Sequence, residues 1–234
     1  MPVEAILFDF NGVIIDDEPL HLEAFRELLA PLGITFTDDE YYGPLLGIPD
    51  SEFMRRLLLM RGRAMAADEL ARLLTDKAAR YMQLLGERDV DLPGLPQCVR
   101  DLAAHMPLGV VSGARRPEIE FHLQRLKLAD CFRFVLAAGE YPRTKPDPAP
   151  YLYGRAGLEK AVGRRLSPAR TVVIEDSPHG VASGIAAGMP VLGFTARVPA
   201  AALPGCFAYL HDFTGFDFAA LTAAFERRPA DSSR

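Results

Sequence analysis

Residues 5–18 constrain the fold of this chain more than any other stretch. They begin with a short apolar run, residues 5–8, which is typical of a strand buried in a parallel sheet. The run ends on a carboxylate, Asp9, and Gly12 then permits a sharp change of chain direction. In an open α/β sheet, ligands bind at the carboxyl ends of the strands. Asp9 is therefore a candidate for chemistry.

Three later stretches place polar residues in comparable positions. Two apolar runs, residues 110–111 and 172–174, also end on polar residues, and a lysine stands in a turn before a predicted helix. The residues at these positions are Ser112, Gly113, Lys145, Glu175 and Asp176. Each of them alone is ordinary, since a serine at a strand end or a lysine before a proline is usually structural or solvated. Their joint order predicts that they meet Asp9 at one edge of a sheet.

The order of elements predicts an α/β fold with a Rossmann-like parallel sheet core and an inserted α-helical cap domain. From residue 95 onward strands alternate with helices, which indicates right-handed crossovers and a parallel sheet. Residues 17–92 carry helical periodicity alone. We therefore predict a core of residues 1–16 and 93–228, a cap of residues 17–92, and a disordered polar tail of residues 229–234.

The four motifs together resemble those of the haloacid dehalogenase-like phosphohydrolase superfamily. These motifs are Asp9, Ser112, Lys145 and the pair Glu175-Asp176, and the resemblance runs from residue 8 to about residue 193. Within this superfamily the chain resembles the helical-cap branch of β-phosphoglucomutase and of phosphoglycolate phosphatase-like phosphatases. The resemblance implies that residues 17–92 form a four- or five-helix lid over the active site.

The resemblance also implies a role for each motif residue. Asp9 would be the nucleophile that forms an aspartyl phosphate, and Lys145 would pair with both the nucleophile and the phosphate. Ser112 and the backbone N–H of Gly113 would bind a phosphoryl oxygen.

A magnesium ion is the cofactor that the resemblance implies. Its protein ligands would be Asp9, Asp176 and the backbone carbonyl of Asn11, while Glu175 would orient a water ligand. Mg²⁺ prefers hard oxygen ligands and keeps several waters, so this ligand set suits its chemistry.

Asn11 departs from the family pattern, which has aspartate at this position as an acid–base group. A carboxamide cannot exchange a proton with the leaving group or with water, and general acid–base catalysis typically contributes about 10²–10⁴-fold. We expect metal and phosphate binding to survive but turnover to be slow. Three origins of Asn11 stay open: a native residue, an engineered substitution, or an asparagine that deamidates because Gly12 follows it.

Three residues are candidates for substrate specificity. His21 is expected at the hinge between core and cap, and Gly47 in a short cap turn that faces the active site in the resembled branch. Arg115 follows the second motif and is expected either to bind a second anionic group or to be solvated. In β-phosphoglucomutase an arginine follows shortly after the glycine that corresponds to Gly47, whereas this chain has Asp50 at that place. The sequence therefore does not favour mutase activity.

The composition and charge of the chain limit which binding partners and which cellular location we expect. A formal net charge of −5 argues against nucleic acid or an anionic membrane as a partner. The sequence lacks an 18-residue apolar run, and its N-terminus enters a strand too early for a signal peptide. Three widely spaced cysteines are expected as reduced thiols in a cytoplasmic protein. We expect a monomer or weak dimer.

The function that these observations favour is Mg²⁺-dependent hydrolysis of small phosphorylated metabolites through an aspartyl phosphate on Asp9, slowed by Asn11. Two alternatives stay open. One is a non-catalytic pseudo-phosphatase that binds a phosphorylated ligand or partner, and the other is a phosphosugar mutase.

Overall fold

The computed structural model describes residues 2–43, 45 and 48–228. It divides into two compact units, Met1–Asp16 with Asp91–Arg234, and Asp17–Val90. The predicted cap boundary at residue 92 is therefore two residues too late. Asp91 belongs to the core unit, where its backbone forms a bridge with Ile15. The predicted disordered tail, residues 229–234, lies outside the described residues.

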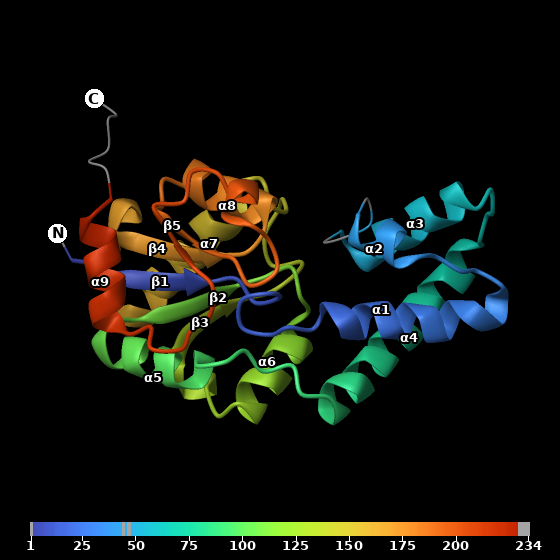
Figure 1. Ribbon diagram of the computed structural model, residues 1–234, viewed down its shortest axis with the longest axis horizontal. Helices are drawn as coiled ribbons and strands as arrows, with labels where there is room; N and C mark the ends of the chain where they lie inside the picture. Colours follow the sequence, from blue (N-terminus) through green and yellow to red (C-terminus); the bar gives the residue numbers. More distant parts are fainter. Residues whose placement is uncertain (1, 44, 46–47, 229–234) are drawn as a thin grey trace. The chain divides into compact units, whose positions relative to one another are not determined.

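The first unit, the core, is built on a six-stranded parallel sheet with the strand order β3-β2-β1-β4-β5-β6 (Figure 1). The strands are β1 (Ala5–Phe8), β2 (Leu108–Val111), β3 (Phe132–Leu136), β4 (Thr171–Glu175), β5 (Val191–Phe194) and β6 (Ala208–Leu210). This is the order of a doubly wound Rossmann-type sheet. The predicted fold class, a Rossmann-like parallel core together with a helical cap, is confirmed.

The register of the central strands sets the position of the candidate site. Phe8 at the end of β1 is opposite Val110 of β2 on one side and Ile174 of β4 on the other. All four residues of β1 are fully buried, as expected for a strand covered on both faces. Because β1, β2 and β4 are parallel and their last residues are opposite one another in the register, their carboxyl ends lie side by side. Residues that directly follow these ends therefore meet.

Helices flank the core sheet. They are α5 (Leu95–His105), α6 (Arg116–Arg125), α7 (Ala149–Val162), α8 (Pro178–Ala186) and α9 (Phe218–Glu226), with short 3₁₀ turns at residues 129–131, 168–170 and 200–202. Ser177 caps the start of α8, because its hydroxyl accepts a hydrogen bond from the backbone N–H of Gly180 at 3.0 Å. Helix α7 begins at Ala149 with Pro148 as its N-cap, and Asp147 Oδ1 accepts a hydrogen bond from the N–H of Ala149.

The second unit, the cap, is helical in its described residues. Its helices are α1 (Glu18–Leu29), α2 (Asp38–Tyr42), α3 (Asp50–Met60) and α4 (Ala67–Glu87), with a 3₁₀ turn at residues 30–32. Helix α2 was not predicted from the sequence, because five residues are too few to show helical periodicity. A capping box could have revealed it: Thr37 Oγ1 accepts from the N–H of Glu40, and Glu40 Oε2 accepts from the N–H of Thr37.

The interior of the cap combines stacked aromatic rings with one buried cation. Phe25 and Phe53 stack with their ring centroids 4.0 Å apart. The Lys77 side chain is only 1% exposed, and its ammonium lies 2.8 Å from Asp50 Oδ2 and 2.5 Å from His21 Nδ1. A buried charge needs such partners, because leaving it unpaired is costly. None of the helices in the described ranges is long and apolar enough to cross a membrane.

Candidate active site

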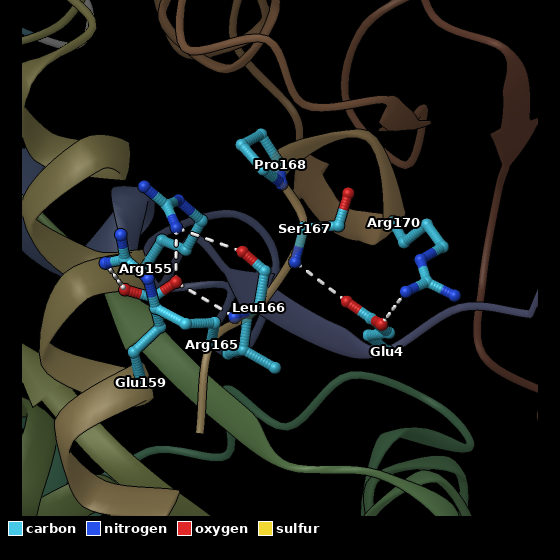
Figure 2. Close-up of a pocket in the computed structure, with 8 residues that line it drawn as sticks. All are labelled: Glu4, Arg155, Glu159, Arg165, Leu166, Ser167, Pro168 and Arg170. Carbon is cyan, nitrogen blue, oxygen red and sulfur yellow. Dashed lines mark hydrogen bonds and ion pairs between the residues drawn. The ribbon is translucent and has the colours of Figure 1, made fainter. Parts of the chain in front are cut away.

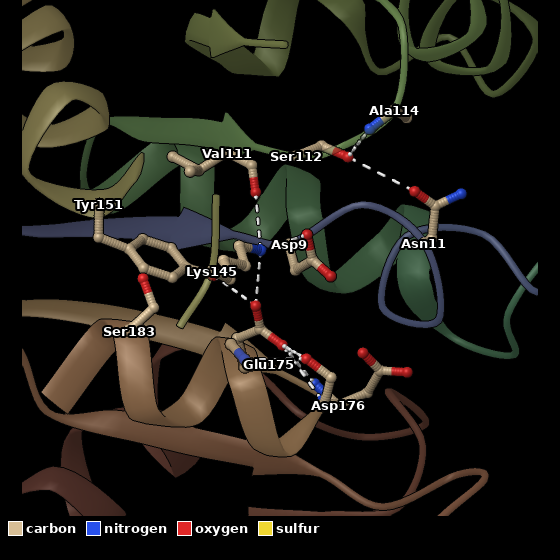
Figure 3. A network of polar contacts seen from close by, with 12 residues as sticks. Asp9, Asn11, Val111, Ser112, Ala114, Lys145, Tyr151, Glu175, Asp176 and Ser183 are labelled. Atoms are coloured by element: carbon tan, nitrogen blue, oxygen red, sulfur yellow. Dashed lines mark hydrogen bonds and ion pairs between the residues drawn. The ribbon is translucent and has the colours of Figure 1, made fainter. Parts of the chain in front are cut away.

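Side chains from four separate segments converge at the carboxyl edge of the core sheet (Figure 3). Asp9 directly follows β1, Ser112 follows β2, and Glu175 and Asp176 stand at the end of β4. Lys145 reaches this edge from the loop between β3 and α7, and its ammonium is 2.7 Å from Asp9 Oδ1. The structure thus brings together the motif residues that the sequence analysis singled out in the core.

The Lys145 ammonium is held by three acceptors. Besides Asp9, it contacts Glu175 Oε1 at 2.6 Å and the backbone carbonyl of Val111 at 3.3 Å. An ammonium has three N–H donors, so each donor has one acceptor. These two carboxylates raise the pKa of Lys145 above its ordinary value against the opposing effect of burial. Lys145 therefore brings a fixed positive charge to the nucleophile.

The Glu175 carboxylate is fully buried, and both of its oxygens accept hydrogen bonds. Oε1 accepts from Lys145 and, at 2.7 Å, from the Tyr151 hydroxyl. Oε2 accepts from the backbone N–H of Asp176 and from the N–H and hydroxyl of Ser177. Tyr151 was not predicted as a site residue. The sequence could have indicated it, because a tyrosine on the buried face of the helix that follows the lysine motif needs a hydrogen-bond partner for its hydroxyl.

We expect Tyr151→Phe to lower turnover about tenfold. A hydrogen bond to a charged group contributes about 1.5–3 kcal/mol, and this one fixes the carboxylate that also holds Lys145. Tyr153→Phe is the matched control, because Tyr153 lies two residues further along α7 and is 51% exposed. Steady-state kinetics and thermal unfolding of both variants measure the effect. Equal activities for the two variants would contradict the assigned role.

Three carboxylates form a site that fits a hard divalent cation. One oxygen each from Asp9, Glu175 and Asp176 lies within 4.8 Å of the others. Burial and the neighbouring Glu175 charge raise the pKa of Asp9 to about 7, although Lys145 opposes this shift, and the same causes raise the pKa of Asp176. Converging carboxylates with raised pKa values are the donor set that Mg²⁺ takes, and a bound cation would relieve their repulsion. Since Glu175 is already fully hydrogen-bonded, Asp9 and Asp176 are the better direct ligands.

These raised pKa values predict how pH affects the stability of the metal-free protein. Between the ordinary pKa of Asp9, 3.8, and about 7, the folded protein holds a proton that the unfolded chain has released. The free energy of unfolding should therefore fall as pH rises through this window. We expect the metal-free protein to melt at a higher temperature at about pH 5 than at about pH 8.

Thermal unfolding at constant ionic strength, with and without Mg²⁺, tests this expectation. Saturating Mg²⁺ should raise the melting temperature most at the higher pH, where the carboxylates are ionised. Asp9→Asn is the control and should flatten the pH dependence. A melting temperature that rises with pH in the metal-free protein would contradict the prediction.

Gly12 shapes the turn after Asp9. Its φ angle of +79° lies in the left-handed region that favours glycine. A Cβ atom at this position would lie 1.9 Å from Asp176 Oδ2, so a side chain would displace a candidate metal ligand. The predicted turn is present at Gly12, and the positive φ angle together with the nearby Asp176 carboxylate explains why glycine occupies it.

Asn11 lies beside Ser112 rather than in the carboxylate cluster (Figure 3). The Ser112 hydroxyl donates a long hydrogen bond of 3.5 Å to Asn11 Oδ1 and accepts one from the backbone N–H of Ala114 at 2.9 Å. Ser112 itself is fully buried. A second residue near this strand end, Tyr141, donates from its hydroxyl to the Ser112 carbonyl at 3.0 Å. The hydroxyl of Ser112 is thus fixed in direction.

The three specificity candidates fall in different places. His21 lies in the cap, where its ring stacks on Tyr81 with centroids 4.3 Å apart. Gly47 lies outside the described residues. The Arg115 side chain is 57% exposed, and its Nε donates to Glu118 Oε1 in the first turn of α6. Substrate recognition by these residues stays a prediction.

A pocket of about 460 Å³ lies at the opposite, amino-terminal edge of the core sheet (Figure 2). Its arginines are already paired with carboxylates. Arg155 Nη1 lies 2.5 Å from Glu159 Oε1, and Arg170 is in contact with Glu4. The chemistry described above is therefore located at the carboxyl edge and not in this pocket.

Comparison with known proteins agrees with this location. The model of the family "Hydrolase: haloacid dehalogenase-like hydrolase" matches residues 3–188. The chain is 31% identical to protein CbbY of Cereibacter sphaeroides, over 94% of this chain and 100% of that protein. It is 30% identical to the fructose-1-phosphate phosphatase YqaB of Escherichia coli K12, over 79% of this chain and 92% of that protein.

A solved structure shows the same fold. The crystal structure of β-phosphoglucomutase from Clostridium difficile matches with a TM-score of 0.81 at 24% identity and covers 96% of this chain and 97% of that one. The chain belongs to the haloacid dehalogenase-like hydrolase family, and it is an enzyme of the phosphatase type.

Proposed function

We propose that the protein is a Mg²⁺-dependent phosphatase that hydrolyses small phosphorylated metabolites, phosphorylated sugars among them, through an aspartyl phosphate on Asp9. One observation carries the proposal: a strand-end carboxylate, Asp9, is salt-bridged to the partly buried Lys145 and faces the acidic residues Glu175 and Asp176. Likeness to a fructose-1-phosphate phosphatase supports the substrate class.

The proposed mechanism begins with substrate binding. Ser112 and the backbone N–H of Gly113 hydrogen-bond phosphoryl oxygens, while Lys145 balances the charge of the nucleophile and the phosphate. Asp9, Asp176 and the Asn11 carbonyl would hold Mg²⁺, and Glu175 would orient a water ligand. A cation held there would supply the further neutralisation that a carboxylate needs to approach a phosphate dianion. An Asp9 oxygen then attacks phosphorus, which is an established type of carboxylate catalysis.

Asn11 is expected to slow both the formation of the aspartyl phosphate and its hydrolysis. An amide neither protonates a departing alkoxide nor deprotonates the water that attacks the aspartyl phosphate, and such acid–base steps typically contribute about 10²–10⁴-fold. The protein is therefore proposed to hold its phosphoryl group longer than it would with a carboxylate at position 11.

Hydrolysis of 4-nitrophenyl phosphate with and without Mg²⁺ tests the proposal. We expect Mg²⁺-dependent release of 4-nitrophenol that is lost in Asp9→Asn. Intact mass should show one phosphoryl group on the protein and none on Asp9→Asn. If activity persists in Asp9→Asn, the proposed nucleophile is wrong.

A non-catalytic binding protein is the second candidate, and Asn11 is the observation that favours it. Such a protein would be stabilised by phosphate esters without Mg²⁺-dependent turnover, so thermal unfolding with and without ligand separates the two functions. Nothing at the described site favours the mutase. A cytoplasmic location and a monomeric or weakly dimeric state stay predictions.

A further inference from the structure

Lys145 and Ser112, the described core side chains that position a phosphoryl group beside Asp9, direct their N–H and O–H groups at other acceptors and not at a leaving group. We propose that the protein takes its phosphoryl group from acyl phosphates, whose leaving group is a carboxylate. This inference rests on the proposed function, because it names the substrate class of the same site.

Lys145 has no N–H to spare for a leaving group. Its three donors are directed at Asp9 Oδ1, Glu175 Oε1 and the Val111 carbonyl, at 2.7, 2.6 and 3.3 Å. Protonating a leaving group would break one of these contacts and remove the charge that balances Asp9. Lys145 is thus an electrostatic group at this site and not an acid.

The other polar side chains next to Asp9 are also engaged in hydrogen bonds or in the carboxylate cluster. The Ser112 hydroxyl accepts from the N–H of Ala114 and points its hydrogen at Asn11 Oδ1, which it would exchange for a phosphoryl oxygen when substrate binds. Neither this hydroxyl nor the Asn11 carboxamide is acidic enough to protonate a leaving group. Both oxygens of Glu175 accept hydrogen bonds, and Asp176 belongs to the carboxylate cluster that fits a cation. The described core residues therefore favour a leaving group that departs without a proton.

Acyl phosphates meet this requirement and alkyl phosphates do not. An alkoxide is the conjugate base of an alcohol, which is about as weak an acid as water. A carboxylate is the conjugate base of an acid with a pKa of about 4. The carboxylate is stable as it leaves, whereas the alkoxide needs a proton in the transition state.

The reaction balances with water as the only co-reactant. An Asp9 oxygen forms a bond to the phosphorus of the acyl phosphate, and the bond from phosphorus to the acyl oxygen breaks, so that the carboxylate leaves with the electron pair. A water oxygen then attacks phosphorus, and the bond from phosphorus to Asp9 breaks. The products are inorganic phosphate and the free Asp9 carboxylate, with one proton released to solvent.

Rates of Asp9 phosphorylation test the proposal in the full-length protein with Mg²⁺. Acetyl phosphate and glucose 6-phosphate are the acyl and alkyl donors, and rapid quenching with intact mass measures the phosphoprotein. Asn11→Asp should accelerate phosphorylation from glucose 6-phosphate by about 10²–10⁴-fold but change that from acetyl phosphate by less than about tenfold. Phenyl and 4-nitrophenyl phosphate, which are similar in shape but differ in leaving group, control for recognition.

Two outcomes would overturn the acyl phosphate proposal. One is acceleration of all donors by the same factor in Asn11→Asp. The other is slower phosphorylation by acetyl phosphate than by phenyl phosphate in the parent protein. The function proposed above fails differently: no donor would then phosphorylate either protein, and Asp9→Asn would behave like its parent.

Discussion

Asn11→Asp should raise steady-state turnover of 4-nitrophenyl phosphate by about 10²-fold or more. The parent protein should show a burst of 4-nitrophenol equal to the concentration of active sites, followed by a slow phase, because water must attack the aspartyl phosphate without a general base. A carboxylate at position 11 removes that delay. Stopped-flow absorbance measures both phases, and the burst should disappear in Asn11→Asp.

Deamidation is the main source of error in this comparison, and the sequence makes it easy to detect. Asn11 is the only asparagine of the chain, so a mass increase that maps to this residue identifies conversion to aspartate. Equal turnover of the two proteins, each with its mass verified, would contradict the prediction. His179, an exposed residue in the first turn of α8 and three residues after Asp176, would then be a candidate donor. His179→Ala and His21→Asn would show whether a histidine supplies the proton.

Lys145→Met should lower Mg²⁺-dependent turnover by at least about 10²-fold. The substitution leaves two carboxylates, Asp9 and Glu175, without the cation that contacts both, and removing one partner of a buried ion pair costs about 3–5 kcal/mol. The free energy of unfolding of the metal-free protein should fall by a similar amount. Denaturant unfolding and steady-state kinetics in the Asn11→Asp background measure the two effects.

Lys160→Met is the matched control, because Lys160 is an exposed lysine near the end of α7. It should change neither the free energy of unfolding nor the activation free energy of turnover by more than about 0.5 kcal/mol. If Lys145→Met keeps the turnover of its parent, the ammonium does not act on the nucleophile. Partial rescue at high Mg²⁺ is expected, since added cation replaces some of the missing charge.

Much of the core was predictable because each motif ends a buried strand. The apolar runs before Asp9, Ser112 and Asp176 become β1, β2 and β4, and parallel register alone then brings their ends together. What the sequence did not reveal is contact between distant segments. The hydrogen bond from Tyr151 to Glu175 depends on how α7 packs on the sheet, which periodicity does not specify.

The cap was predictable in kind but not in its interior. Helical spacing indicated that residues 17–92 are helical, whereas the five-residue α2 carried no periodic signal of its own. The buried Lys77 was not anticipated either, since a lysine on a helix usually reaches solvent. Its pairing with Asp50 and His21 joins residues from three helices, and no local pattern indicates such a pairing.

The position of β1 between two strands that come much later in the chain bears on how the enzyme acquires its activity. β1 is paired on one side with β2, about a hundred residues later, and on the other side with β4, later still. Contacts between residues so far apart in sequence close slowly during folding. A nascent chain that has emerged only through β3 possesses the nucleophile but neither Glu175 nor Asp176. Recovery of phosphatase activity after dilution from denaturant should therefore report the docking of β4 against β1, and lag behind the return of helical circular dichroism.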